Sequence, residues 1–150
     1  MPMSATHSTI HGSAVLVGAR AMLIRGPSGS GKSQLAFALI EAARAGAFAF
    51  GRLVADDRVF VEAAGDRLLL RPADTIKGLI EIRGLGIRHL PFEPLAVAGH
   101  VIDLAAADAE RLPSEAARHA TIAGVPLARL PVAAGCDPLP LVLALLRFGA

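Results

Sequence analysis

The stretch GPSGSGKS, residues 26–33, decides what kind of fold this sequence can form. Its glycines, lysine and final serine match the P-loop pattern, in which successive backbone N–H groups turn inward to surround phosphate oxygens. The lysine of such a loop reaches the β- and γ-phosphates of a nucleotide, and the hydroxyl after it binds Mg²⁺. We therefore expect a phosphate-binding loop made of Gly26, Pro27, Ser28, Gly29, Ser30, Gly31, Lys32 and Ser33.

The residues on either side of this loop follow the order that the motif requires. SAVLVG at 13–18 and AMLIR at 21–25 are short apolar runs broken by Gly-Ala-Arg, which is typical of two neighbouring strands with a tight connection. KSQLAFALIEAARA at 32–45 has no proline and has apolar residues at helical spacing, so it predicts a helix. The order strand, loop, helix favours a phosphate-binding loop over a flexible turn.

The rest of the chain mostly predicts strands. An apolar run ends at Asp56, and the next two apolar runs are separated by Ala64-Gly65, which is typical of a β-hairpin. We expect an α/β fold with a mixed, largely β core and flanking helices, forming one domain over residues 1–150, because no repeat or linker divides the chain. The expected elements are a strand before Asp56, a hairpin of 58–63 with 66–72, β-structure around 79–91 and 95–104, another strand within 121–132, and a helix over 138–148.

Composition excludes several classes of protein. The net charge is only +2 and the arginines are scattered, so a nucleic-acid partner is not expected. The single cysteine, Cys136, cannot form an internal disulfide, which favours a reducing cytoplasm. No apolar run approaches the roughly 18 residues of a membrane span, and the N-terminal residues do not resemble a secretory signal. We expect a cytoplasmic protein without a membrane partner.

Asp56 and Asp57 are the first candidates for chemistry beyond phosphate binding. A P-loop enzyme needs a carboxylate near its metal and, for transfer to a hydroxyl, a group that accepts the hydroxyl proton. Successive side chains of a strand point to opposite faces, so both aspartates reach one site only if the strand ends and turns there. The alternative is a solvated turn before the hairpin.

Glu81 and Arg83 stand in an apolar run directly before Gly84-Leu85-Gly86. In a strand these two side chains share one face, opposite Ile80 and Ile82, so a polar face near phosphate and metal is a reasonable interpretation. A solvated edge strand is the alternative.

Taken together, these residues resemble the catalytic domain of the HPr kinase/phosphorylase family. The resemblance rests on His11-Gly12, the loop GPSGSGKS, LVADD at 53–57 and above all EIRGLGI at 81–87, and it extends from about His11 to Pro131. It implies a P-loop kinase domain of the phosphoenolpyruvate carboxykinase-like kind, with ATP and Mg²⁺ as cofactors. It also implies that the chain phosphorylates a serine of HPr, the phosphocarrier protein of the phosphotransferase system, and that it forms a homo-oligomer, a hexamer.

The resemblance also assigns roles to single residues. His11 matches the active-site histidine of the family, and the catalytic aspartate falls within Asp56-Asp57; we favour Asp57, which leaves Asp56 nearer the metal. Glu81 matches a second Mg²⁺ ligand beside Ser33. Lys32 is the catalytic P-loop lysine, and Arg111 matches a later catalytic arginine.

This sequence departs from the family pattern in three places. The connection from the expected helix to LVADD, through residues 44–48, is several residues longer than is usual. Only about ten residues precede His11, so it resembles the short form that lacks an additional N-terminal domain. Where the family commonly has P-V-R-P-G-R, linked to dephosphorylation, this chain has PVAAGCD at 131–137. Guanidinium groups that bind phosphate through charge-assisted hydrogen bonds are therefore missing, and we expect a kinase with weak phosphorolysis.

Two other functions remain open. One is a P-loop kinase of a small metabolite, although such kinases carry an arginine-rich lid and this chain has β-structure after the first helix. The other is a non-catalytic nucleotide-sensing module. Three carboxylates favour an enzyme over a sensor, because phosphate binding alone requires no proton acceptor. They belong to Asp56, Asp57 and Glu81.

Overall fold

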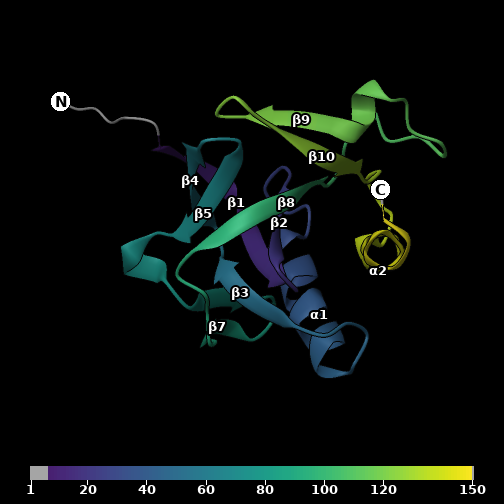
Figure 1. The fold of residues 1–150 in the computed structure, drawn as a ribbon. Coiled ribbons are helices and arrows are strands. Elements are labelled where there is room, and N and C mark those ends of the chain that lie inside the picture. The colour runs from purple at the N-terminus through teal and green to yellow at the C-terminus, as the bar shows by residue number, and fades with distance from the viewer. Residues whose placement is uncertain (1–6, 150) are drawn as a thin grey trace.

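The computed structural model describes residues 7–149 and shows a mixed α/β fold in which strands predominate (Figure 1). This confirms the mixed, largely β core expected from the sequence. In chain order the elements are β1 (His7–Val17), β2 (Arg20–Arg25), α1 (Lys32–Arg44), β3 (Gly51–Ala55), β4 (Arg58–Ala64), β5 (Arg67–Pro72), the 3-10 turn η1 (Asp74–Ile76), β6 (Leu79–Ile82), β7 (Gly86–His89), β8 (Ala96–Asp103), the 3-10 turn η2 (Ala116–Arg118), β9 (His119–Ile122), β10 (Val125–Pro131) and α2 (Pro138–Phe148).

The long strand β1 organises the main sheet. Its first half pairs antiparallel with β4, and its second half pairs antiparallel with β2 and with β3. The sheet continues from β4 through β5 and β8 to β10 and β9, and a further pairing of β2 with β8 closes β2, β1, β4, β5 and β8 into a ring. β6 and β7 form a separate hairpin.

Alternation along the strands produces two apolar clusters. Ala14, Leu23 and Val101 belong to one cluster, which also contains the apolar residues of the β4–β5 hairpin. Their neighbours in the chain face the other way, and Val15 and Ile102 pack with α1 and α2. Successive strand residues point to opposite faces, so each strand contributes to both clusters. Both helices lie on one side of the strands (Figure 1).

Four strands end at the same edge of this sheet. β8 runs parallel to both β2 and β10, while β2 and β3 are both antiparallel to β1 and therefore run in the same direction. The backbone ties the ends together, because Leu104 N donates to Arg25 O (2.9 Å) and Val132 N donates to Asp103 O (2.8 Å). The segments that follow β2, β3, β8 and β10 consequently meet at one edge.

The elements around the glycine loop, residues 26–33, are those expected from the sequence, with one correction. The β1–β2 pair, α1, and the β4–β5 hairpin are all present. His11, however, does not precede the first strand: it lies inside β1, opposite Arg58 of β4. The apolar run at 13–18 marks only the second half of β1, which pairs with β2 and β3.

Two other expectations about strands were wrong in detail. The run at 121–132 forms two strands, because Ala123 and Gly124 both adopt positive φ (52° and 79°) and make the tight turn of a hairpin. β6 ends at Ile82, so Arg83 lies in the turn to β7 and not in a strand.

The C-terminal helix α2 begins where the sequence predicts. The Asp137 carboxylate accepts a hydrogen bond from Leu139 N (3.1 Å), and Pro138 occupies the first helical position, which stabilises a helix start. Within residues 7–149 neither this helix nor α1 is long and apolar enough to span a membrane.

Candidate active site

The glycine loop leaves the start of α1 open. Gly29 and Gly31 adopt left-handed φ values of 82° and 99°, which residues with a Cβ rarely do. Gly31 is the N-cap residue and offers no side chain to the helix, and the first turn of α1 carries no acidic residue. The first N–H groups of a helix have no partner within it, so this uncapped end is suited to bind an anion.

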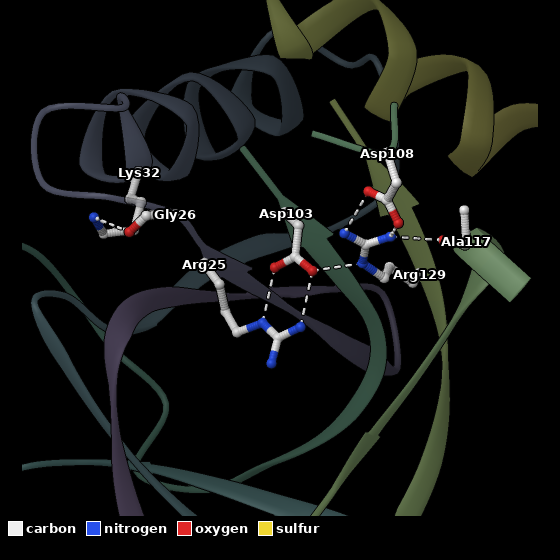
Figure 2. A network of polar contacts seen from close by, with 7 residues as sticks. All are labelled: Arg25, Gly26, Lys32, Asp103, Asp108, Ala117 and Arg129. Carbon is white, nitrogen blue, oxygen red and sulfur yellow. Dashed lines mark hydrogen bonds and ion pairs between the residues drawn. The ribbon is translucent and has the colours of Figure 1, made fainter. Parts of the chain in front are cut away.

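Lys32 is buried and its ammonium group lies over the glycine loop. Its Nζ donates to the carbonyl oxygens of Gly26 (2.9 Å) and Pro27 (3.0 Å), the first of which Figure 2 shows. Within the described residues no carboxylate forms an ion pair with it. The positive charge is therefore held at the loop by neutral groups and remains available to an anionic ligand.

Asp56 is buried directly behind the glycine loop. Its carboxylate accepts hydrogen bonds from Ser33 Oγ (2.7 and 2.9 Å to the two oxygens), Ser13 Oγ (2.6 Å) and Glu81 N (3.2 Å). All of these donors are neutral groups, and the side chain is only 5% exposed. The hydrogen bonds fix the position of the Ser33 hydroxyl at the start of α1.

Asp57 points the other way because the chain turns at this residue. β3 ends at Ala55, and Asp57 has φ 71°, a left-handed conformation that aspartate tolerates better than most residues. Its Oδ1 lies 3.2 Å from His11 Nε2, and both side chains are largely exposed. The condition stated for the pair of aspartates, a strand that ends and turns, is therefore met.

These groups surround a cavity of about 160 Å³. The structure brings together eight predicted site residues: His11, Asp57 and Glu81, with Ser28, Gly29, Gly31, Lys32 and Ser33 of the glycine loop. Asp56 does not line the cavity, but its carboxylate is hydrogen-bonded to three residues that do, Ser13, Ser33 and Glu81. The remaining lining residues are Ser13, Gln34 and Arg83.

Arg111 is the predicted site residue that lies apart. It is exposed in the segment between β8 and η2 and is not among the residues that line this cavity. The same segment contains Asp108, which Arg129 of β10 holds through two hydrogen bonds (2.8 and 3.0 Å). The role that the resemblance gives to Arg111 stays a prediction.

The residues present fit a Mg²⁺–nucleotide ligand. Three features among the described residues suit such a ligand: the open start of α1, the Lys32 ammonium group, which has no carboxylate partner there, and the buried Asp56 carboxylate, which has no cation there. Residues 7–149 contain no cluster of three or more His, Cys, Asp or Glu side chains arranged to hold a metal. Mg²⁺ commonly takes one or two carboxylates and completes its shell with phosphates and water, so Ser33 and Glu81 suffice as protein ligands, with Asp56 behind them.

Sequence reasoning missed Ser13. It is the small polar residue in the apolar stretch of β1, only 1% exposed, and it supplies one of the donors to Asp56. Its neighbour Gly12 is also required, because a Cβ there would lie 2.5 Å from Ile24 O of β2. A buried hydroxyl in an otherwise apolar strand was the available signal, since buried polar groups need partners.

A polar network beneath the edge holds the strand ends in place (Figure 2). The Asp103 carboxylate at the end of β8 accepts two hydrogen bonds from Arg25 of β2 (both 2.8 Å) and one from Arg129 of β10 (2.6 Å). Burial opposes the charge of Asp103, but the two guanidinium groups outweigh it, so the pKa of this carboxyl lies below its usual range. Arg25 directly precedes Gly26, so the network anchors the glycine loop.

Comparison with known proteins supports the sequence resemblance. Residues 3–91 match the model of the family described as HPr Serine kinase C-terminal domain. The chain is 40% identical over 87 residues to an HPr kinase/phosphorylase of Exiguobacterium sp. (57% of this chain, 24% of the relative) and 42% identical over 83 residues to one of Chlorobium limicola (54% and 23%). It thus spans about a quarter of the length of these relatives.

A solved structure shares the fold over nearly the whole chain. It is described as the structure of the Hpr(Ser) kinase/phosphatase from Coxiella burnetii, and it superposes with a TM-score of 0.72. The alignment covers 93% of this chain and 88% of the other, at 24% identity. The likeness in fold therefore extends well beyond residue 91, where the match to the family model ends.

Proposed function

The chain belongs to the family of HPr serine kinase C-terminal domains, and from this we propose that it is an ATP-dependent kinase of a serine on the phosphocarrier protein HPr. The observation that carries the proposal is the position of Asp57. Its carboxylate lies beside His11 on the wall of the cavity that the glycine loop also lines. A phosphate-binding loop and a proton acceptor facing one cavity are what phosphoryl transfer to a hydroxyl requires.

In this proposal the glycine loop acts as a P-loop and binds the phosphates of ATP. The N–H groups at the start of α1 donate to phosphate oxygens, and Lys32 exchanges its two carbonyl contacts for the β- and γ-phosphates. Ser33 and Glu81 hold Mg²⁺, which when bound screens the charge of the transferring phosphoryl group. Asp56 orients the Ser33 hydroxyl for this task through its hydrogen bonds.

The transfer step assigns the proton to Asp57. The serine oxygen of HPr attacks the γ-phosphorus, its O–H proton passes to the Asp57 carboxylate, and the bond between the γ-phosphorus and the β–γ bridging oxygen breaks to release ADP. His11 is within hydrogen-bonding distance of Asp57 and holds this carboxylate toward the cavity. The exposure of both side chains leaves room for a protein substrate to reach them.

The reverse reaction uses the same groups. Inorganic phosphate attacks the phosphorus of phosphoserine, so that a P–O–P bond forms while the bond between this phosphorus and the serine oxygen breaks. The serine oxygen takes a proton from the protonated Asp57 carboxyl, and pyrophosphate leaves. We propose that this direction is weak, because the segment after β10 carries Ala133, Ala134 and Cys136 and no arginine. Each missing guanidinium removes charge-assisted hydrogen bonds of roughly 1.5–3 kcal/mol.

Serine-phosphorylated HPr tests the proposed weakness directly. Incubation with the protein, Mg²⁺ and inorganic phosphate is expected to release pyrophosphate far more slowly than the forward reaction consumes ATP. Pyrophosphate release as fast as the forward reaction would contradict this part of the proposal.

The forward reaction separates the proposal from its two alternatives. Incubation with ATP, Mg²⁺ and the HPr of the same organism is expected to give HPr with one phosphoserine, located by mass spectrometry. Phosphorylation of a small metabolite in place of HPr would identify a metabolite kinase. Nucleotide binding without transfer to any acceptor would identify a sensor.

A further inference from the structure

A second cavity adjoins the glycine loop at the edge where the parallel strands end. It encloses about 310 Å³ and is walled by residues 27–30 after β2, Leu104 and Ala105 after β8, and residues 132–136 after β10. β2, β8 and β10 are parallel neighbours, and ligands of open α/β sheets bind outside the carboxyl ends of such strands. A volume of a few hundred Å³ suits a small organic group.

The two cavities at the glycine loop differ in charge. The first is lined by the charged side chains of Lys32, Asp57, Glu81 and Arg83. The second is lined by glycine, proline, aliphatic, serine and cysteine residues, and among the described residues no charged side chain faces it. A phosphate would find no cation in the second cavity, whereas a neutral, flat group would find an apolar wall.

Two residues in the wall of the second cavity are unusual. The Oγ of Ser30 is buried and has no hydrogen-bond partner among residues 7–149, which is uncommon for a buried hydroxyl. Ala105 has a φ of 53°, a left-handed conformation that is unfavourable for a residue with a Cβ. The Ser30 hydroxyl lies against Gly26 and is covered by the glycine loop, whereas the strained backbone of Ala105 is at the cavity, and such strain tends to persist where function requires it.

We propose that this second cavity binds the nucleoside of the nucleotide, with its neutral base and ribose, while the phosphates lie on the glycine loop. The inference rests on the proposed function. Ser28 and Gly29 line both cavities, so one ligand can occupy both at once. The small residues Ala133, Ala134 and Gly135 leave space at the position where the family commonly has arginine.

Cys136 offers a test on the unmodified protein. It is the single cysteine of the chain, it is exposed, and it lines the second cavity. We expect Mg²⁺–ATP to slow its reaction with a maleimide several-fold, and Mg²⁺–tripolyphosphate, which lacks a nucleoside, to leave the rate unchanged. Equal rates with and without ATP, or equal protection by tripolyphosphate, would overturn the inference.

A substitution that fills the cavity gives a second test. Ala134 is exposed, so Ala134→Trp places a large ring at the cavity without disturbing a packed core. By calorimetry we expect this variant to bind Mg²⁺–ATP about tenfold more weakly and Mg²⁺–tripolyphosphate as well as the wild type does. Ala49→Trp, an exposed position in the α1–β3 connection, is the matched control and is expected to change neither affinity.

The two ligands also separate failure of this inference from failure of the proposed function. If Ala134→Trp weakens neither ligand, or weakens both equally, the nucleoside does not occupy this cavity and the inference is wrong. If the wild type binds neither ATP nor tripolyphosphate, the glycine loop is not a phosphate site, and the proposed function fails together with the inference.

Discussion

At the scale of single residues, two adjacent aspartates acquire different environments from one backbone turn. Asp56 is buried and bound by neutral donors, while Asp57 is exposed beside His11. The sequence predicted that both serve one site and left open which is the base. It could not separate them, because the separation depends on the left-handed φ of Asp57 and on Ser13, which lies far away in the chain.

Ser13→Ala tests how much Asp56 depends on its buried donors. The substitution removes the shortest of the hydrogen bonds to this carboxylate (2.6 Å), so we expect the free energy of unfolding in urea to fall by about 1–2 kcal/mol. Ser8→Ala, at an exposed position of the same strand, is expected to change it by less than about 0.5 kcal/mol. Equal effects of the two substitutions would show that the Ser13 hydroxyl is not a required donor.

At the scale of the elements, the sequence predicted most helices and strands but not how the strands join. The hairpin of β4 and β5 and the order β2, glycine loop, α1 follow from local patterns of apolar residues and glycines. The pairing of β2 with β8, which closes the ring and aligns the strand ends, joins segments more than seventy residues apart in sequence. No local pattern of residues specifies such a contact. The same holds for the polar network that fixes it, which joins Arg25, Asp103 and Arg129.

The network predicts a defined dependence of stability on pH. The pKa of Asp103 in the folded protein lies below its ordinary value of 3.8. The ionised carboxylate therefore adds its full contribution to the free energy of unfolding above about pH 4, and this contribution is lost as the pH falls through the lower pKa of the folded state. Asp103→Asn lacks this contribution, and we expect its unfolding free energy to lie about 2 kcal/mol below that of the wild type at pH 7. The difference is expected to shrink below pH 4.

Urea unfolding of both proteins between pH 3 and 7 checks this prediction. Asp66→Asn, at an exposed position of the β4–β5 turn, serves as the control and is expected to follow the wild type throughout. A difference between Asp103→Asn and wild type that stays constant down to pH 3 would mean that the carboxylate charge is not what stabilises the strand ends.

For the molecule as a whole, the resemblance to a known family predicted more of the fold and function than any local pattern of residues did. The motifs in residues 11–87 identified the family, and the solved relative extends the likeness in fold to 93% of the chain. The later part was harder to predict, because its strands lack distinctive motifs, and Arg111, the one site residue predicted there, does not line the cavity at the glycine loop. The single domain and the hexamer stay predictions, and light scattering of the purified protein tests the latter.

Ligand binding at the glycine loop is expected to stabilise the molecule as a whole. Mg²⁺–ATP at about a hundred times its dissociation constant adds about 2.7 kcal/mol to the free energy of unfolding, so the melting temperature rises by several degrees. Lys32→Ala removes the cation that faces the phosphates and should abolish most of this rise. A rise of the same size in wild type and variant would place the nucleotide away from the loop.

In the proposed reaction, Asp57 accepts the proton of a serine on HPr while the glycine loop holds ATP. The most direct measurement compares phosphate transfer from ATP to HPr by the wild type and by Asp57→Asn, with ATP affinity measured in parallel. We expect the variant to bind ATP as the wild type does and to transfer phosphate about 10²–10⁴ times more slowly. Transfer by Asp57→Asn at the wild-type rate would show that Asp57 is not the proton acceptor.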